Sequence, residues 1–226
     1  MNDKQCVAEQ AALQVEDGMI VGLGTGSTAN YFIEAIAKRR IDDGLNFQVV
    51  ASSVVSTIKA RQLGLQLLAL EHIEQIDLYV DGADEVTPDM TLLKGRGADL
   101  VREKLLAKAS DKFLVLIDAS KRVERIGQIY PIPVEVMPFA WQLVQRSLGE
   151  IGGQSKLRAN AGQDGLAVTA YGSLVLDVMF ESAIDHRELN DALNAIPGIV
   201  EHGIFYGLAG AVFCAHEGHV QEQWAG

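Results

Sequence analysis

The sequence YVDGADEVTPDMTLLKGRGADLVREK, residues 79–104, brings three kinds of functional group together in a short stretch. The first is a set of carboxylates after a short apolar run: Asp81, Asp84 and Glu85. The second is Lys94, in a glycine-rich turn, and the third is Glu103, inside a segment that we expect to be helical. Carboxylates that act without a metal are suited to general acid–base catalysis. The stretch therefore favours an enzyme that moves protons.

Apolar runs alternate with amphipathic segments on both sides of this stretch, and this alternation predicts strands that alternate with helices. We expect strands at residues 19–23, 47–51, 66–70, 76–80 and 113–117, and helices at residues 3–15, 29–40, 54–63 and 98–110. In the last helix, the candidate core contacts are Leu100, Val101, Leu105 and Leu106. This order predicts an α/β fold with a mostly parallel sheet covered on both faces. Ligands of such sheets bind beyond the carboxyl ends of the strands, where four polar loops fall, after Leu23, Ala51, Val80 and Ile117.

The pattern changes near residue 131, where a second, smaller domain is expected. Strands are predicted at residues 132–137, 156–159, 166–170, 174–180 and 199–205, and helices at residues 139–149 and 187–196. This order predicts a small split-βαβ domain. A final hairpin from residue 207 onward rejoins the first domain. We therefore expect a catalytic domain of residues 1–130 and 206–226, with an α+β domain of residues 131–205 inserted before the carboxyl-terminal strands.

The composition narrows the possible classes of function. The chain has 226 residues, 48% of them hydrophobic, and a formal net charge of −11, which argues against nonspecific binding to nucleic acid or to an anionic membrane. Two cysteines do not form a disulfide framework, and the amino terminus lacks the pattern of a signal peptide. No run approaches the ~20 apolar residues that a membrane helix needs. We therefore expect a cytoplasmic protein without a membrane or nucleic-acid partner.

The loop Gly22–Thr28 follows a predicted strand and precedes a predicted helix. Its glycines stand at alternate positions, unlike those of the dinucleotide-binding fingerprint. Hydroxyl groups at Thr25, Ser27 and Thr28 and a helix amino terminus are able to receive a phosphate. Tight packing between strand and helix also requires glycine. The loop pattern alone leaves both uses open.

The charged residues of the central stretch have structural alternatives. Asp81, Asp84 and Glu85 also suit a turn with a helix cap, or a divalent metal site. The neighbouring cations Lys94 and Arg96 weaken the metal alternative because they compete for the same carboxylates. A cation at a helix amino terminus is unfavourable by itself, so the Lys94 turn indicates an anion nearby, although a solvated surface turn is the alternative.

Two further features are more typical of a surface. A glutamate inside a helix, such as Glu103, is most often solvated, and only its neighbours in the sequence suggest otherwise. Cys214, His216 and His219 have the spacing of metal ligands, but they lack a fourth ligand nearby, so zinc is disfavoured. We expect no metal and no organic cofactor.

Taken together, the segments GLGTGSTA, SS, YVDGADEV, KGRGADLVREK and DASK resemble the A type of ribose-5-phosphate isomerases, in the family's order and over nearly the whole chain. The resemblance implies a Rossmann-like domain and a small ferredoxin-like domain. It implies the interconversion of D-ribose 5-phosphate and D-ribulose 5-phosphate through an enediol(ate), in the pentose phosphate pathway, without a cofactor. It also implies a cytoplasmic homodimer or homotetramer, whose interface we expect the small domain to build.

The resemblance also implies a role for each site residue. Glu103 is the expected base between C1 and C2, and Asp81 is expected to handle the protons of the sugar oxygens and to help open the ring. Asp84 would orient the sugar hydroxyls, and Lys94 would stabilise the enediolate oxygen. The expected substrate-binding residues are Lys4, Thr25, Gly26, Ser27, Thr28, Asp81, Gly82, Ala83, Asp84, Lys94, Gly95, Arg96, Gly97 and Lys121.

The chain departs from the family pattern in two places. Arg96 replaces a glycine in the Lys94 turn, where it either points outward or pairs with Asp99, and the segment 165–173 is longer than usual. Two other functions are alternatives to the isomerisation of a sugar phosphate. A sugar-phosphate sensor on the same fold has no need of Asp81, Lys94 and Glu103 together. A coenzyme A transferase requires a different glutamate motif, which the sequence lacks.

Overall fold

The computed structural model describes residues 2–181 and 184–226. These residues form two compact units. The first contains the described residues up to Ala83, with Arg102–Arg122 and Leu208–Gly226, and the second contains Asp84–Val101 and Val123–Gly207. The glycine-rich turn of residues 94–98, here called the Lys94 turn, therefore belongs to the second unit, whereas Asp81 and Glu103 belong to the first.

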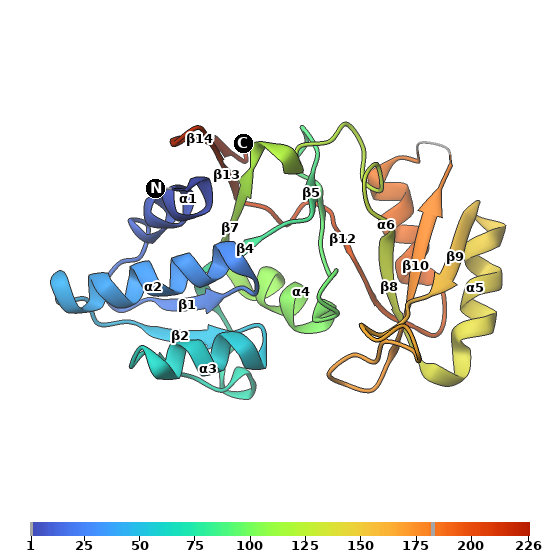
Figure 1. Cartoon of the computed structure of the whole chain (residues 1–226), viewed down its shortest axis with the longest axis horizontal. Helices are drawn as coiled ribbons and strands as arrows, with labels where there is room; N and C mark the ends of the chain where they lie inside the picture. Colours follow the sequence, from blue (N-terminus) through green and yellow to red (C-terminus); the bar gives the residue numbers. More distant parts are fainter. Residues whose placement is uncertain (1, 182–183) are drawn as a thin grey trace. The chain divides into compact units, whose positions relative to one another are not determined.

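The first unit is built on a seven-stranded sheet, shown in Figure 1, with the strand order β14-β13-β7-β4-β1-β2-β3. Its strands are β1 (Ile20–Leu23), β2 (Gln48–Ala51), β3 (Gln66–Leu67), β4 (Ile76–Gly82), β7 (Ser110–Asp118), β13 (Ala211–His216) and β14 (His219–Trp224). All neighbouring pairs are parallel except β13 with β14. The predicted α/β fold with a mostly parallel sheet is confirmed, and the final hairpin adds its last two strands.

Two of the four α-helices that the structure describes in this part begin at a side chain that caps them. The four are α1 (Asp3–Ala12), α2 (Ser27–Asp42), α3 (Val54–Gln62) and α4 (Leu100–Ala109), with short 3₁₀ helices η1 (Leu70–His72) and η2 (Ala119–Lys121). The side chains of Asn2 and Ser53 accept backbone N–H groups at the starts of α1 and α3. Helices α1 and α2 share a buried core with the sheet. No helix among the described residues is long and apolar enough to cross a membrane.

The second unit contains a four-stranded antiparallel sheet with the order β11-β8-β10-β9. Its elements are β8 (Ile132–Val136), η3 (Pro138–Ala140), α5 (Trp141–Glu150), β9 (Gly153–Leu157), β10 (Leu174–Phe180), α6 (His186–Ala195) and β11 (Ile199–His202). If these four strands are numbered 1 to 4 along the chain, their order in the sheet is 4-1-3-2, which is the arrangement of a split βαβ fold. Val144 of α5 and Leu189 of α6 lie in one buried cluster with Val134 and Leu176, so both helices cover the same face of the sheet.

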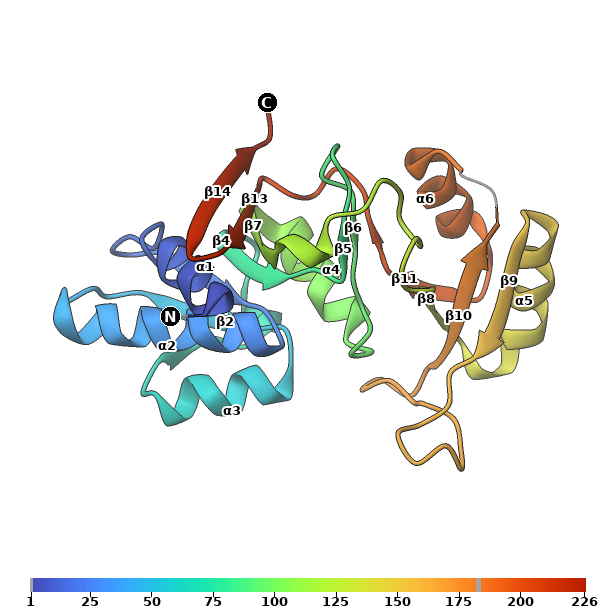
Figure 2. The ribbon, with the colours of Figure 1, turned by 45° about the horizontal axis from the view of Figure 1, so that its top comes forward.

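The structure corrects several predicted elements. Residues 66–70 form a strand only at Gln66–Leu67, before η1. Residues 166–170 form isolated bridges instead of a strand, within the long β9–β10 connection seen in Figure 2. The predicted strand 199–205 is interrupted at Gly203, where a Cβ atom would lie 2.4 Å from the carbonyl oxygen of Lys94. Leu105 is not a core contact, because its side chain is 52% exposed.

One sheet of the second unit was not predicted at all. It consists of three strands of two residues each: β5 (Glu85–Val86), β6 (Leu92–Leu93) and β12 (Ile204–Phe205). All pairs are antiparallel, with β6 in the middle. This sheet carries the chain from Asp84 to Lys94, and it is the scaffold of the Lys94 turn.

Candidate active site

Asp81 lies in β4, between β1 and β7. Its side chain is fully buried and accepts three hydrogen bonds. The donors are the backbone N–H groups of Thr25 and Gly82, at 3.0 and 2.7 Å, and the hydroxyl of Tyr79, at 2.6 Å. These bonds fix the carboxylate at the carboxyl edge of the parallel sheet, where a ligand is expected.

Tyr79 stands two residues before Asp81, and no motif in the sequence assigns it a role. Its ring stacks on Phe113 at a centroid distance of 4.8 Å. Burial raises the pKa of the Tyr79 phenol well above its usual range, and the negative charges of Asp81 and Glu103 raise it further. The phenol therefore remains a proton donor to Asp81. Asp81 and Glu103 therefore both lie close enough to the Tyr79 phenol for their charges to act on it.

Glu103 lies in the first turn of α4, and it is buried, with 6% of its surface exposed. The interpretation of an isolated surface glutamate is therefore wrong. The preceding residue, Arg102, donates a hydrogen bond to the carbonyl oxygen of Ala51 at 3.0 Å and attaches the start of this segment to the end of β2. Burial beside other charged groups is typical of catalytic carboxylates, which marks Glu103 as a candidate catalytic group.

The glycine-rich loop after β1 packs against Asp81 and against the loop after β2. A Cβ atom on Gly24 would lie 2.1 Å from the carboxylate of Asp81, so the loop approaches as closely as glycine permits. The Thr25 hydroxyl lies 2.9 and 2.8 Å from the hydroxyls of Ser52 and Ser53. Gly26 has a φ of +112° and precedes the first helical residue, Ser27. The tight packing that the sequence left open is therefore present, and the loop leads into the amino terminus of α2, whose binding of a phosphate stays a prediction.

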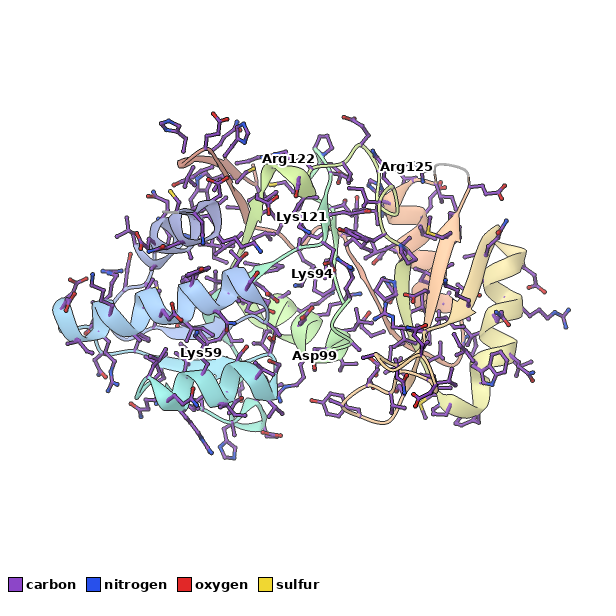
Figure 3. All side chains as sticks on the ribbon, in the orientation of Figure 1. Lys59, Lys94, Asp99, Lys121, Arg122 and Arg125 are labelled. Carbon is purple, nitrogen blue, oxygen red and sulfur yellow. The ribbon has the colours of Figure 1, made fainter. Side chains whose placement is uncertain are left out.

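A cation lies at this helix start. The Lys4 ammonium donates a hydrogen bond to the Ser27 hydroxyl at 2.9 Å. Lys4 also lines an open hollow of about 580 Å³ together with Asp118, Ser120 and His216. Lys121, labelled in Figure 3, ends the short helix η2 that follows Asp118. Local cations of this kind allow an acidic protein to bind an anion.

The second unit carries Lys94, which follows β6 and is labelled in Figure 3. It is 4% exposed, its ammonium lies 5.6 Å from the centre of the Phe205 ring, and its backbone N–H donates to Gly203 at 2.9 Å. Gly95 follows with a φ of +93° and has no room for a side chain beside Leu100. Lys94 and Gly95 are therefore tightly packed, whereas Arg96 and Gly97 at the tip of the turn are exposed.

Asp84 and Arg96 face each other within the second unit. The Arg96 guanidinium lies 3.9 Å from an Asp84 carboxylate oxygen and 3.9 Å from the centre of the Tyr130 ring. The Arg96 N–H also points to Asp84, at 3.4 Å. The structure thus gives Arg96 a partner that the sequence analysis had not considered. Glu85, in contrast, is a structural anchor, because its carboxylate accepts three backbone N–H groups from residues 127–130.

The remaining predicted residues lie at the edges of these two groups. Gly82 ends β4, Ala83 follows it, Thr28 lies in the first turn of α2, and Gly97 lies in the Lys94 turn. Within residues 2–181 and 184–226, no three His, Cys, Asp or Glu side chains are arranged to hold a metal ion. Cys214 is buried in β13, and His216 and His219 flank the turn of the last hairpin. The described donors therefore do not form a metal site.

Buried carboxylates in a parallel-sheet unit that also carries a lysine at a helix amino terminus suit an enzyme that moves protons on an anionic substrate. Comparison with known proteins defines the family. The model of "Ribose 5-phosphate isomerase A (phosphoriboisomerase A)" matches residues 48–219, and the chain belongs to this family. Its members are aldose–ketose isomerases, and so is this chain.

Relatives of similar length support the assignment. The ribose-5-phosphate isomerase A of Prochlorococcus marinus is 46% identical over 211 residues, which cover 92% of this chain and 91% of the relative. That of Thermosynechococcus vestitus is 43% identical over 92% and 89% of the two chains. Among solved structures, ribose 5-phosphate isomerase A from Methanocaldococcus jannaschii gives a TM-score of 0.92 at 36% identity, covering 98% of both chains. A D-ribose-5-phosphate isomerase in complex with phospho-erythronic acid gives 0.95 at 34% identity over the full length of both.

Proposed function

We propose that Glu103 is the base that carries a proton between C1 and C2 of the substrate while D-ribose 5-phosphate and D-ribulose 5-phosphate interconvert through an enediol(ate). The observation that carries this role is the burial of Glu103 in the same unit as Asp81, with both charges acting on Tyr79. A base for carbon must be shielded from bulk water and close to groups that handle the oxygen protons.

The oxygen chemistry falls to the other charged residues. Asp81 exchanges protons with the sugar oxygens and assists ring opening. Three hydrogen-bond donors hold its carboxylate in a fixed position, which supports this role. Asp84 orients the sugar hydroxyls. Lys94 stabilises the negative oxygen of the enediolate, an interaction that is strongest in the transition state and so raises kcat. Lys94 is nearly fully buried, which suits this role because burial strengthens electrostatic interactions.

The phosphate is received by the first unit. Its ligands are the Lys4 ammonium, the backbone and hydroxyls of the loop Thr25–Thr28, and Lys121. The contact between Lys4 and Ser27 supports this placement, because it joins a cation to a helix amino terminus. Residues Gly82, Ala83, Gly95, Arg96 and Gly97 contact the sugar. The relative that was solved with phospho-erythronic acid supports a phosphorylated, sugar-like ligand for this chain.

The mechanism is tested with Glu103→Gln, which keeps the size of the side chain and removes the base. We expect kcat for ribose 5-phosphate to fall by about 10² to 10⁴. Binding of inorganic phosphate, measured by calorimetry, is expected to be retained. Glu150→Gln, on the exposed surface of α5, is the matched control and keeps full activity.

All assays are run after EDTA treatment, and the wild-type protein is expected to remain active. Full activity of Glu103→Gln would remove Glu103 from the mechanism. Binding of ribose 5-phosphate by the wild-type protein without turnover would indicate a sensor.

The cellular setting follows from the reaction. We propose that the protein acts in the non-oxidative branch of the pentose phosphate pathway, in the cytoplasm, as a homodimer or homotetramer. Its two cysteines, one of them buried in β13, fit a reducing compartment.

A further inference from the structure

The Lys94 turn, residues 94–98, has a backbone conformation that requires support. Gly95 and Ala98 have φ values of +93° and +64°, and the Ala98 N–H donates to the Gly95 carbonyl at 3.1 Å. Alanine in the left-handed region is uncommon and persists where the surroundings impose it. Two supports are the Gly203 carbonyl, which accepts the Lys94 N–H, and the Asp84 carboxylate, which faces Arg96. A third support comes from the small sheet.

That support is Arg158, which follows β9. One guanidinium nitrogen lies 3.1 Å from the carbonyl oxygen of Arg96 and 3.4 Å from that of Gly95. The other two nitrogens donate to the carboxylate of Asp177 at 2.6 to 3.2 Å. Arg158 and Asp177 are 17% and 12% exposed. A single side chain therefore joins two consecutive carbonyl groups of the turn to a fixed carboxylate.

Asp177 is a fixed anchor for the Arg158 side chain. It stands in β10, paired with Pro133 of β8 on one side and Lys156 of β9 on the other. Its neighbours Leu176 and Val178 point into the core under α5 and α6, so Asp177 lies on the face of the sheet without helices. The planar guanidinium of arginine presents its donors in a fixed fork, which allows the Asp177 pair and the turn contact to form together.

We propose that Arg158 is a positioning residue for the isomerase reaction, which holds the Lys94 turn in the conformation that aims Lys94 at the substrate oxygen. This inference rests on the proposed role of Lys94. A misplaced oxyanion-stabilising group lowers kcat and leaves the binding of the phosphate unchanged, because the phosphate ligands belong to the other unit. Neither Arg158 nor Asp177 touches the reacting atoms in this account.

The first test requires no activity. Trypsin cleaves after Arg96, and cleavage of a native protein requires local opening of the segment. We expect Arg158→Gln to accelerate cleavage of the Arg96–Gly97 bond about tenfold or more, measured by mass spectrometry of the fragments under native conditions. The control is Arg146→Gln, which removes an exposed arginine–carboxylate pair on α5 in the same unit and leaves the rate unchanged. An unchanged cleavage rate in folded Arg158→Gln would overturn the proposal.

The second test separates positioning from a general loss of structure. In Arg158→Gln we expect kcat for ribose 5-phosphate to fall about 10- to 100-fold while KM stays within about twofold. The carboxylate of phospho-erythronic acid resembles the negative oxygens of the enediolate, so the affinity for this compound should fall together with kcat. The affinity for inorganic phosphate should not fall. Arg158→Lys restores the charge without the fork and is expected to recover only part of kcat. A fall in phosphate affinity equal to the fall in kcat would indicate a structural role only and would contradict the proposal.

Asp177→Asn is the milder variant in case Arg158→Gln does not fold. It keeps the shape of the side chain and weakens its pairing with Arg158, so the same changes are expected at smaller amplitude. Wild-type kcat and a wild-type cleavage rate in Asp177→Asn would also count against the proposal. If the wild-type protein showed no isomerase activity, the proposed function would fail, while the trypsin result would still report whether Arg158 holds the turn.

Discussion

The hydroxyl of Tyr79 donates to one oxygen of Asp81, and two backbone N–H groups donate to the other. Because the pKa of the phenol is raised by burial and by the charges of Asp81 and Glu103, the phenol stays protonated across the physiological range of pH. We therefore expect Tyr79 to act as a fixed donor that orients Asp81.

Replacing Tyr79 with phenylalanine removes this donor and keeps the ring stacked on Phe113. We expect kcat to fall about tenfold, since one hydrogen bond to a charged group is lost, while the protein stays folded. Steady-state kinetics with ribose 5-phosphate measure the change. Tyr31→Phe is the control, because among the described hydrogen bonds the Tyr31 hydroxyl accepts from Asn2 and does not reach Asp81. A wild-type kcat in Tyr79→Phe would show that the orientation of Asp81 does not depend on the phenol.

At the residue scale, the sequence identified the groups that carry charge and missed those that position them. Asp81, Lys94 and Glu103 stand in specific motifs, so the sequence alone was enough to propose them as site residues. The role of Tyr79 required the strand geometry that turns its hydroxyl back to Asp81. Arg158 was not predictable, because it reaches the Lys94 turn across about 60 residues of intervening sequence and no local pattern links the two. The predicted site residues themselves stay predictions until the variants are measured.

At the scale of elements, the close approach of β1 to β4 explains the glycines at the end of β1. A Cβ atom on Gly22 would lie 2.6 Å from the Tyr79 ring, and one on Gly24 would lie 2.1 Å from the Asp81 carboxylate. Contacts below 3.0 Å require one partner to move. The buried ring and the fixed carboxylate have little freedom to do so.

We therefore expect Gly24→Ala to displace Asp81 and to lower kcat by about 10² or more, because small displacements at a reacting centre are costly. The matched control is Gly149→Ala in α5, where a Cβ atom meets no other atom within 4 Å. That change should preserve activity and raise the melting temperature slightly, since alanine is the better helix former. Kinetics and thermal unfolding of both variants make the comparison. Normal activity of Gly24→Ala would mean that the loop can move away from Asp81.

The helix-free face of the small sheet also carries a buried carboxylate. Glu135 of β8 is 1% exposed and accepts a hydrogen bond from the Thr169 hydroxyl at 2.8 Å. Burial raises the pKa of Glu135, the hydroxyls of Thr169 and Ser173 oppose this, and the charges of Glu201 and Asp99 add to it. The folded state therefore holds the proton of Glu135 more tightly than the unfolded state does.

The sign of the pH dependence follows from this difference. Glu135 favours folding fully below the pKa of an unfolded glutamate, about 4.3, and loses that contribution as the pH rises through its raised folded pKa. Glu135→Gln cannot ionise, so its melting temperature should exceed that of the wild type at neutral pH and match it near pH 4. Thermal unfolding across this range tests the effect, with Glu150→Gln on the exposed face of α5 as the control. A difference between Glu135→Gln and the wild type that does not change with pH would contradict it.

The elements that the sequence could predict are those with enough residues to show a period. The long strands and the six α-helices of the described residues were located within a few residues. The sheet of β5, β6 and β12 was missed because a strand of two residues has no periodicity. Residues 166–170 have an alternating pattern typical of a strand, yet Val168 is 62% exposed and the segment lies in a loop. The break at Gly203 depends on the approach of the Lys94 carbonyl, which is a tertiary contact.

At the scale of the whole molecule, the expected domain boundaries after residues 130 and 205 stay a prediction, as does the oligomer. Apolar side chains on the outer surface of α5 support an interface on the small unit: Phe139, just before the helix, is 84% exposed, and Leu143 is 69% exposed. Contiguous exposed apolar patches are typical of surfaces that bind another protein, so we take the surface around Phe139 and Leu143 as the candidate interface.

We expect light scattering to give two or four times the chain mass of 24.4 kDa. Leu143→Glu should shift the mass toward that of a single chain, because a charge would be buried in the interface. Ile41→Glu is the control, since Ile41 is 80% exposed on α2 in the other unit. Equal masses for Leu143→Glu and the wild type would place the interface elsewhere.

The order of strands in the large sheet has a consequence for biosynthesis. Strand β13 pairs with β7, although almost one hundred residues separate them along the chain, and Asp3 and Cys6 of α1 contact Gly218 in the hairpin that follows β13. A nascent polypeptide that has emerged only as far as the small sheet therefore presents β7 with an unpaired edge, to which other chains can add. The strands of the small sheet all lie between residues 132 and 202, so this sheet is free to fold first on the ribosome, while the large sheet requires the later hairpin. Truncation before residue 211 should consequently yield a chain that aggregates or binds chaperones, even though every proposed catalytic residue is present.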